Sequence, residues 1–438
     1  MTKGSLMNLS RRCLLLGLSA ATAATLAACT GSSSTDATKP ASGGSAAAGD
    51  GKLSGEITFQ TWSLKNEKFT PYFEALIKAF QDQHPGTTIK WIDQPGDGYE
   101  EKILQQANSG ELPDVVNLPS DFAYQLAQVE QIVDLKAATP EAMSSYVPGG
   151  LAAYTFDGVE GTYGYPWYLG TDVSWWNTDL LTQAGLDVAN APKTLEEYYA
   201  WAETAAAKGV KLVSYMPGVT DFKNSGVTIF KDGKFVFNTD EAAAIVDKFA
   251  GFYKNGAMPA EALNDDTADN ANMFTQEKAG YTTATTSFVS QLENDAPNVL
   301  KHVDCTPRFE TAPLFTQGIS VAKGSKNMDL ALAFAQFVTN NDNQVAFVKI
   351  ARGFMPGTVE GNNSPESFSG ELDNELMKKA VGLAAAAMPK AEMPAPIQYS
   401  NDMKAYVQQQ IALAIKGDTT AKAALDAAVE YCNKALTA

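Results

Sequence analysis

The sequence predicts an α/β protein of two lobes, the first of which is built on an open and largely parallel sheet. Residues 55–120 alternate between strand and helix patterns, which is the order that a parallel sheet requires. The chain has 438 residues, too many for one hydrophobic core and enough for two lobes. Apolar residues make up 45% of the chain, so neither lobe lacks core material.

The alternating region begins with a short strand that ends at Trp62. A helix follows, because the apolar residues after the strand recur at i, i+3, i+4, i+7, i+8 and i+11, which places them on one face. These residues are Phe69, Tyr72, Phe73, Leu76, Ile77 and Phe80. The expected elements are, in order, a strand at 56–61, a helix at 70–83, a strand at 87–93, a helix at 99–108 and a strand at 113–118. The last strand has a continuous apolar centre, as expected for a strand that is covered on both faces.

Polar and aromatic residues follow the carboxyl ends of these strands. Trp62 and Ser63 end the first strand, Gln94 follows the second, and Ser120 and Asp121 follow the third. Open α/β sheets bind ligands beyond the carboxyl ends of their strands. None of the turns has a GxGxxG or Walker pattern, so nothing here is expected to cradle a phosphate. The sequence therefore predicts a binding lobe.

The charge balance argues against nucleic acid as a partner. Formal net charge is −17, and the only charged groups in the first 28 residues are Lys3, Arg11 and Arg12. Without that segment, 30 basic and 50 acidic residues remain, a formal charge of −20. Such a surface repels a polyanion.

Enzymatic activity is not expected either. The only histidines are His84, which precedes a helix-breaking proline, and His302, which lies in a polar loop. No Ser-His or Cys-His spacing supplies the parts for nucleophilic catalysis. We expect no cofactor and no bound metal.

The first residues form a predicted export signal. The positive segment around Arg11 and Arg12 is followed by an apolar stretch that is too short to span a bilayer comfortably. Residues 26–29 (LAAC) resemble the lipobox of bacterial lipoproteins, in which the signal is cut before a cysteine that receives a diacylglycerol. The resemblance implies a cleaved signal at 1–28 and a lipid on Cys29. Alternatives are a plain cleaved signal, and export by either the general or the twin-arginine route. Residues 29–54, rich in Gly, Ser and Ala, are expected to be a disordered tether.

The remainder of the chain carries further local signals. Residues 161–177 contain aromatic and β-branched residues typical of strands, entered through Pro166. Thr194 and Glu197 form a capping-box pattern before a helix. Asp232 and Gly233 predict a type I′ hairpin turn. Later helices are expected from about Thr239, at 329–338, at 402–415 and at 420–436.

The order of these features resembles the extracellular solute-binding proteins of ABC importers, in the sugar-binding branch that includes maltose-binding protein. The matching pieces extend from about residue 55 to residue 436. They are the strand–Trp62–helix opening and residues 112–116 (LPDVV), 163–167 (YGYPW), 176–177 (WN), 192–197 (PKTLEE), 274–280 (FTQEKAG), 285–288 (TTSF), 318–326 and 353–356 (GFMP). The sequence departs from the family pattern at Phe288, where Trp is usual, and at Trp176, where Tyr is usual.

The resemblance implies a two-lobed periplasmic-binding-protein-like fold, each lobe a mostly parallel sheet flanked by helices and joined by hinge crossings. The first lobe would comprise 55–165 and 306–350, and the second 166–305 and 351–438. The ligand, a carbohydrate and in particular an oligosaccharide, would lie between the lobes and be delivered to the permease subunits of an ABC transporter. The protein would be a monomer outside the cytoplasm, held at the outer face of the cell membrane by its lipid.

A sugar site needs aromatic faces for C–H groups and polar side chains for hydroxyls. The predicted ligand-binding residues are Trp62, Ser63, Asp121, Trp167, Tyr168, Phe222, Phe288, Arg352 and Phe354. Core packing is the competing interpretation for each aromatic residue, and a helix N-cap is the competing one for Asp121. We interpret Trp175 and Trp176 as structural, because adjacent strand residues point to opposite faces.

Two other functions compete with sugar binding. A phosphorylated polyol would need cationic groups, for which the candidates are Lys65, Arg308 and Arg352. A lipid-anchored glycoside hydrolase would need two carboxylates about 5 to 9 Å apart. The sequence leaves open whether Cys305 and Cys432 form a disulfide.

Overall fold

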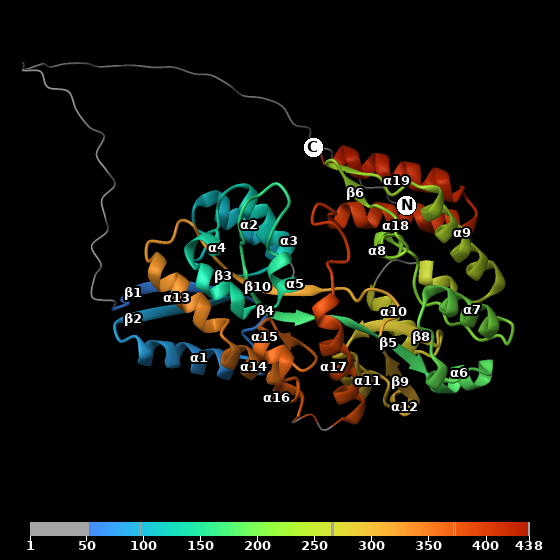
Figure 1. Cartoon of the computed structure of the whole chain (residues 1–438), viewed down its shortest axis with the longest axis horizontal. Helices are drawn as coiled ribbons and strands as arrows, with labels where there is room; N and C mark the ends of the chain where they lie inside the picture. Colours follow the sequence, from blue (N-terminus) through green and yellow to red (C-terminus); the bar gives the residue numbers. More distant parts are fainter. Residues whose placement is uncertain (1–51, 97, 264–266, 371, 373, 437–438) are drawn as a thin grey trace, which may run out of the picture. The chain divides into compact units, whose positions relative to one another are not determined.

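The structure is a computed structural model that describes residues 52–96, 98–263, 267–370, 372 and 374–436. These residues belong to one compact unit, Lys52–Ala438. The fold is mixed α/β, as predicted, with helices packed around two main sheets (Figure 1). The expected signal and Cys29 lie outside the described residues, as does the expected tether up to residue 51. Within the described ranges, no helix has both the length and the apolar character needed to cross a membrane.

The first sheet has six strands in the order β11-β4-β10-β3-β1-β2. Its strands are β1 (Gly55–Trp62), β2 (Thr87–Gln94), β3 (Val115–Pro119), β4 (Tyr165–Gly170), β10 (Phe315–Val321) and β11 (Met355–Pro356). β1 pairs in parallel with β2 and β3, as predicted, because each connection between them is a helix. β10 runs antiparallel to β3 and β4, and β11 runs antiparallel to β4.

Helices cover both faces of this sheet, and we call the sheet with these helices the first lobe. They are α1 (Thr70–Gln83), α2 (Tyr99–Ser109), α3 (Ser120–Gln128), α4 (Leu135–Ala138), α5 (Pro148–Ala152), α13 (Met328–Val338), α14 (Asn341–Ile350), α15 (Val359–Asn363) and α16 (Glu366–Ser369). α1 has the predicted bounds, and its buried residues Phe73, Leu76 and Phe80 belong to the predicted apolar stripe. Short 3₁₀ helices occur at Pro140–Ser145, Val188–Asn190, Ala260–Leu263 and Met388–Lys390.

The second sheet has three strands in the order β8-β5-β9 and differs from the prediction. Its strands are β5 (Asp172–Asn177), β8 (Tyr281–Thr285) and β9 (Val303–Thr306), and both pairings are antiparallel rather than parallel. The reason is the path of the chain, since β5 follows directly from β4 of the first sheet and β9 leads back toward β10. Strands that enter and leave a lobe in this way run in opposite directions.

The second lobe consists of this sheet, a hairpin and the helices packed with them. The helices are α6 (Thr178–Ala184), α7 (Leu195–Ala206), α8 (Val219–Asn224), α9 (Asp240–Asn255), α10 (Thr267–Thr275), α11 (Phe288–Asp295), α12 (Pro297–Leu300), α17 (Glu375–Ala387), α18 (Asn401–Lys416) and α19 (Ala421–Ala435). The hairpin joins β6 (Phe230–Lys231) to β7 (Lys234–Phe235), and its turn residues Asp232 and Gly233 have φ of 52° and 75°, as a type I′ turn requires. Thr194 caps α7, as predicted, by accepting from the Glu197 N–H at 3.2 Å.

Adjacent tryptophans on β5 cover the two faces of the second sheet. Trp175 and Trp176 are both fully buried, and they belong to different hydrophobic clusters. The cluster of Trp175 also contains Phe59 and Trp167 of the first lobe. The cluster of Trp176 is formed by second-lobe helices such as α7, α9, α18 and α19. Both tryptophans are structural, as interpreted from the sequence.

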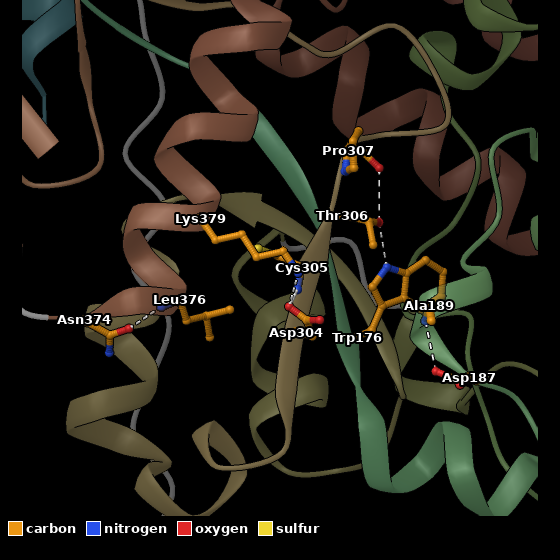
Figure 2. Close-up of polar contacts among 10 residues, drawn as sticks. All are labelled: Trp176, Asp187, Ala189, Asp304, Cys305, Thr306, Pro307, Asn374, Leu376 and Lys379. Atoms are coloured by element: carbon orange, nitrogen blue, oxygen red, sulfur yellow. Dashed lines mark hydrogen bonds and ion pairs between the residues drawn. The ribbon is translucent and has the colours of Figure 1, made fainter. Parts of the chain in front are cut away.

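The side chains of Asp304 and Thr306 on strand β9 form polar contacts with α17 and with strand β5, as Figure 2 shows. Asp304 forms an ion pair with Lys379 of α17 at 2.5 Å. The hydroxyl of Thr306 accepts a hydrogen bond from the Trp176 indole N–H at 2.9 Å and donates to the Pro307 carbonyl at 3.2 Å. Cys305 is buried and free, as is Cys432, so these two cysteines do not form a disulfide.

Strand pairing revises the expected lobe boundaries. Residues 166–170 were assigned to the second lobe, but they form most of β4 in the first sheet. Residues 351–438 were also assigned there, yet β11, at Met355–Pro356, pairs with β4 through Met355 and Leu169. The chain crosses from one sheet to the other between Gly170 and Asp172, and it returns between Thr306 and Phe315.

Candidate functional site

Trp62 stands where the sequence places it, at the carboxyl end of β1. Its side chain is half-buried, and its ring stacks on that of Tyr99, with centroids 5.3 Å apart and planes 5° apart. The ring of Phe122 lies 6.0 Å away in a tilted arrangement. Ser63 is exposed and has a φ of 57°, a conformation that turns the chain sharply at the end of the strand.

Asp121 lies in the first turn of α3, directly after β3. It is not the N-cap of the helix, because that position is held by Pro119, which makes no side-chain cap hydrogen bond. The carboxylate is exposed and accepts a hydrogen bond from the Phe122 N–H at 3.1 Å. Desolvation by the surrounding protein raises its pKa, and backbone hydrogen bonds partly offset that effect. The Asp121 carboxylate is therefore an accessible hydrogen-bond acceptor in a partly desolvated environment.

A second group of predicted residues gathers at the carboxyl end of β4. Tyr168 is half-buried, and its ring meets that of Phe354 edge-on with centroids 5.1 Å apart. Arg352 is exposed in the same turn. Gly353 fixes this turn, because it has a φ of 97° and a Cβ there would lie 2.5 Å from the backbone N of Ser287. The Thr286 hydroxyl donates to the Gly353 carbonyl at 2.7 Å. Two segments quoted for the resemblance, 285–288 and 353–356, are thus in contact.

Three predicted residues are core residues in the structure, which corrects the expectation that they face a ligand. Trp167 is fully buried, with its ring 4.7 Å from that of Phe347, because its position on β4 points toward the first lobe's main core. Phe222 is fully buried on the inner face of α8. Phe288 is 3% exposed and packs edge-on against Trp175 at 5.5 Å.

Four charged residues of the second lobe come together that the sequence did not group. We call Asp172, Asp221, Arg308 and Glu310 the second-lobe cluster. Arg308 and Glu310 form an ion pair of 2.9 Å, with side chains 11% and 4% exposed. The Asp221 carboxylate accepts from the Gly218 N–H at 2.7 Å, as an N-terminal cap of α8.

The second-lobe cluster is strongly desolvated while remaining in part accessible. Burial raises the pKa of Asp172 to about 6, although the charge of Arg308 opposes the shift. Burial, followed by the charge of Glu310, raises the pKa of Asp221 to about 7. Both side chains nevertheless keep some contact with solvent. Carboxylates with this combination of properties are candidates for a functional site.

Aromatic rings surround the second-lobe cluster. Tyr198 stacks on Phe309 with centroids 5.0 Å apart and lies 4.7 Å from Tyr281. The charges of Glu310 and Asp221 act on Tyr198 and Tyr215, so both hydroxyls are near the carboxylates. Of this group, the sequence analysis identified only Arg308, as a candidate cation for binding a phosphorylated polyol. Its partners are 2, 87 and 136 positions away in the chain, and only folding brings them together.

Residues 391–399, between α17 and α18, contact both lobes, and we call them the crossing segment. Met393 and Ile397 pack against the first-lobe hydrophobic cluster that includes Tyr99, as Trp62 and Phe122 also do. On the other side, Lys223 of α8 forms an ion pair with Glu392 at 2.8 Å and donates to the Met393 carbonyl at 3.0 Å. The segment therefore touches both lobes.

A cavity of about 580 Å³ lies along the crossing segment. Its wall combines Phe156 and Asp157 of the first lobe with Lys223 and Phe230 of the second. The volume is in the range of small-ligand sites. None of the nine predicted residues lines it.

This arrangement suits recognition of a polar solute. Trp62 offers an aromatic face, while Asp121 and the second-lobe cluster offer carboxylate acceptors. Within the described ranges, no group of three or more His, Cys, Asp or Glu side chains is placed to hold a metal ion.

Comparison with known proteins gives the family. The family described as bacterial extracellular solute-binding protein matches residues 75–369, well over half of the chain. A galactooligosaccharide-binding protein of Bacillus subtilis is 25% identical over 450 residues, covering 97% of each chain. A diacetylchitobiose binding protein of Streptomyces coelicolor is 24% identical over 365 residues, covering 78% of this chain and 82% of that one.

Solved structures share the fold. A putative oligosaccharide periplasmic-binding protein from Synechococcus sp. MITs9220 aligns with a TM-score of 0.74 at 23% identity, over 87% of this chain and 99% of that one. A cyclic alpha-maltosyl-1,6-maltose binding protein from Arthrobacter globiformis aligns with a TM-score of 0.71 at 18% identity, over 87% and 99% of the two chains. The two-lobed fold inferred from the sequence agrees with these neighbours, and the chain belongs to the bacterial extracellular solute-binding protein family.

Proposed function

We propose that the protein captures a carbohydrate, in particular an oligosaccharide, between its two lobes and delivers it to the permease of an ABC importer. The observation that carries the proposal is that Trp62 ends β1 and Asp121 follows β3, the strand that pairs with β1 in the first sheet. A ring held by Tyr99 offers a stacking face, and the exposed carboxylate of Asp121, one residue before the Phe122 ring that lies 6.0 Å from that of Trp62, offers an acceptor for hydroxyls. Relatives named for galactooligosaccharide and diacetylchitobiose support the same solute class.

The proposed site differs from the set derived from the sequence. On the first lobe it comprises Trp62, Ser63, Asp121, Tyr168, Arg352 and Phe354, each of which keeps some exposed surface. On the second lobe it comprises the second-lobe cluster. Trp167, Phe222 and Phe288 support the site from within the cores rather than touching the solute.

A panel of oligosaccharides, screened by thermal shift and followed by titration calorimetry, tests the proposal. A member of the panel should raise the unfolding temperature, because a ligand that binds only the folded state stabilises it by mass action. The stabilisation should be lost in the Asp121→Ala and Trp62→Ala variants. Absence of binding by every saccharide in the panel would overturn the proposed solute class.

The competing solute and activity have less support. A phosphorylated polyol needs several free cations, but Arg308 is paired with Glu310 and Lys65 lies over the Trp91 ring at 4.9 Å, so Arg352 alone remains of the three candidates. We further propose that the protein has no catalytic activity and returns its solute unchanged. Release of reducing sugar from a bound oligosaccharide would contradict this.

We also propose that the protein is a lipoprotein, with the signal at 1–28 removed and Cys29 acylated. Each buried CH₂ of an acyl chain contributes about 0.8 kcal/mol to membrane binding, and a slack tether leaves the folded part free to meet a permease. Metabolic labelling with a palmitate analogue should mark the parent chain and leave Cys29→Ala unlabelled. Label on the Ala variant would exclude acylation of Cys29 as its source.

Closure around the solute is expected for two lobes joined by chain crossings. Small-angle scattering should show a smaller radius of gyration when the best ligand is added, with the protein still a monomer. An unchanged profile at saturating ligand would argue against closure.

A further inference from the structure

We infer that Phe315, together with Phe354 and Tyr168, forms a second stacking surface of the solute site, which holds a sugar unit other than the one on Trp62. We call these three rings the Phe315 surface. The inference rests on the proposed function and narrows its solute class to oligosaccharides that are long enough to cover both places.

Phe315 is an exposed aromatic residue at the start of β10, and the sequence did not single it out. It is 42% exposed. The other large hydrophobic side chains that are exposed in the described ranges, Val129 and Val359, are aliphatic. A lone exposed apolar residue is ordinary, but Phe315 lies next to two half-buried rings, and contiguous apolar surface marks a place of binding.

Gly170 brings the Phe315 surface together. It ends β4 and pairs with Phe315 of β10. A Cβ on Gly170 would lie 3.6 Å from two ring atoms of Phe354 and 3.8 Å from the Cβ of Phe315. Tyr168, two residues earlier on β4, meets the Phe354 ring edge-on with centroids 5.1 Å apart. Because Gly170 has no side chain, β4 leaves the space between Phe315 and Phe354 unfilled.

The Phe315 surface lies where the two lobes join, since β4 ends and β10 begins there. The Thr171 hydroxyl donates to the Pro313 carbonyl at 2.6 Å, so the outgoing and returning crossings lie side by side. Phe354 directly follows Gly353, whose carbonyl accepts from the Thr286 hydroxyl of the second lobe at 2.7 Å. A solute held between the lobes is therefore next to these rings.

Hydrogen-bond donors border the Phe315 surface. Gln317 lies two residues after Phe315 on β10 and thus on the same face of the strand. Its Oε1 accepts from the Asn117 Nδ2 at 2.9 Å, which orients the amide and leaves the Nε2 group without a partner among the described residues. Arg352, exposed and two residues before Phe354, is a second donor. A sugar ring suits such a surface, because its C–H groups meet the aromatic faces and its hydroxyl oxygens accept from the donors.

The strand order separates the Phe315 surface from Trp62. β1 and β10 are both neighbours of β3, so their axes are two strand spacings apart, about 10 Å. β10 runs antiparallel to β3, so it begins at the edge where β1 and β3 end. Both places therefore lie along one edge of the sheet. A single pyranose ring is shorter than their separation, so a solute that uses both must contain at least two linked units.

The test uses saccharides that differ only in length. Malto-, cello- and galacto-oligosaccharides of one to four units provide such series, and the series that binds best is titrated by calorimetry against the full-length protein. The affinity of the parent should rise at least about tenfold between the shortest and the longest member, because the added units reach the Phe315 surface. Phe315→Ala should remove most of that rise and change affinity for the shortest member by less than about twofold.

Further variants show whether a flat ring is what matters. Phe315→Tyr keeps an aromatic face and should retain the length dependence, whereas Phe315→Leu keeps apolar volume without that face and should lose it. Gly170→Val fills the space between Phe315 and Phe354 and should act like Phe315→Ala. Val359→Ala, a change of another exposed apolar side chain at the start of α15, is the matched control and should leave every affinity unchanged. Thermal unfolding shows whether each variant is folded, which is expected for changes of the exposed Phe315.

The outcomes separate this inference from the proposed function. A length dependence that is the same in the parent and in Phe315→Ala overturns the Phe315 surface and leaves the proposed function intact. An equal loss of affinity for every member also overturns it, because Phe315 would then touch the unit on Trp62. A parent that self-associates through this ring, with a concentration-dependent mass in analytical ultracentrifugation that Phe315→Ala abolishes while saccharide binding is unchanged, overturns it as well. A parent that binds no saccharide of any length overturns both.

Discussion

The indole ring of Trp62 lies face to face with the phenol ring of Tyr99, with centroids 5.3 Å apart and planes 5° apart. Tyr99 is itself fixed, because it is 1% exposed and its hydroxyl donates to the Asn117 carbonyl of β3 at 2.7 Å. The half-buried Trp62 ring is thus held in place before any ligand arrives. A pre-oriented ring loses little rotamer freedom when a solute stacks on it.

Replacing Trp62 by alanine should weaken sugar binding more than it weakens the fold. We expect affinity for the best saccharide to fall by roughly ten- to a hundredfold, equivalent to about 1.4 to 2.8 kcal/mol, since the stacking face and the exclusion of water are lost together. Trp62→Phe should recover part of the affinity because it keeps an aromatic face. Calorimetric titration of both variants gives the measurement, and an alanine variant that binds within twofold of the parent would remove Trp62 from the site.

Trp167→Ala should have the opposite pattern. Its side chain is fully enclosed against Phe73 and Phe347, so its removal leaves a large cavity. We expect the free energy of unfolding to fall by about 3 to 5 kcal/mol, measured by denaturant titration. Affinity per folded molecule should stay close to that of the parent.

The two tryptophan variants act as controls for each other. A folded Trp167→Ala protein that loses sugar binding without losing stability would return Trp167 to the ligand site. Comparing both changes on one denaturation curve and one titration series therefore assigns each ring to the core or to the solute.

Local features of the fold could be predicted from the sequence. Helix α1 has its predicted bounds, 70–83, and the Asp232–Gly233 turn has the expected positive φ values. Such features depend on residues close together in the chain. The antiparallel pairing of the second sheet and the position of β11 in the first sheet could not be predicted. Pairings such as Met355 with Leu169 join segments nearly two hundred residues apart.

The site could be predicted only in part, for a similar reason. Trp62 and Asp121 follow strands whose order was evident, so their position at the sheet edge was predictable. Trp167 and Tyr168 are neighbours on β4, and pattern alone did not show which of them faces the core. The second-lobe cluster joins Asp172 and Asp221 to the crossing that carries Arg308, a combination with no local signature.

The ion pair between Lys223 and Glu392 should contribute little to stability despite its 2.8 Å distance. The two side chains are 36% and 60% exposed, so water and salt screen their attraction. A double-mutant cycle with Lys223→Met and Glu392→Gln should give a coupling of about 0 to 1 kcal/mol that declines as salt is added. The pair Lys78 and Asp82 on α1, 2.6 Å apart, is a matched surface control. A larger coupling that is insensitive to salt would mean that the pair is desolvated where the lobes meet.

The raised pKa values of Asp172 and Asp221 predict how stability depends on pH. The usual pKa of both carboxyls is 3.8. In the folded protein, burial disfavours the charged form and raises the pKa to about 6 for Asp172 and to about 7 for Asp221. At pH values between 3.8 and these raised pKa values, the folded state holds protons that the unfolded chain has released. The free energy of unfolding should therefore fall as pH rises through this window and level off above about 7.

Variants isolate this contribution from that of other groups. In Asp221→Asn the carboxyl cannot titrate, so its free energy of unfolding should decline less between about pH 4.5 and about pH 7, by at most about 1.4 kcal/mol per pH unit. Urea unfolding of the parent and the variant at matched pH values gives the difference, in which carboxyls common to both cancel. Asp247→Asn, an exposed change on the same lobe, should keep the slope of the parent. Parallel profiles for the parent and Asp221→Asn would show that Asp221 titrates normally in the folded protein, and the cluster would then lack the desolvation that its burial implies.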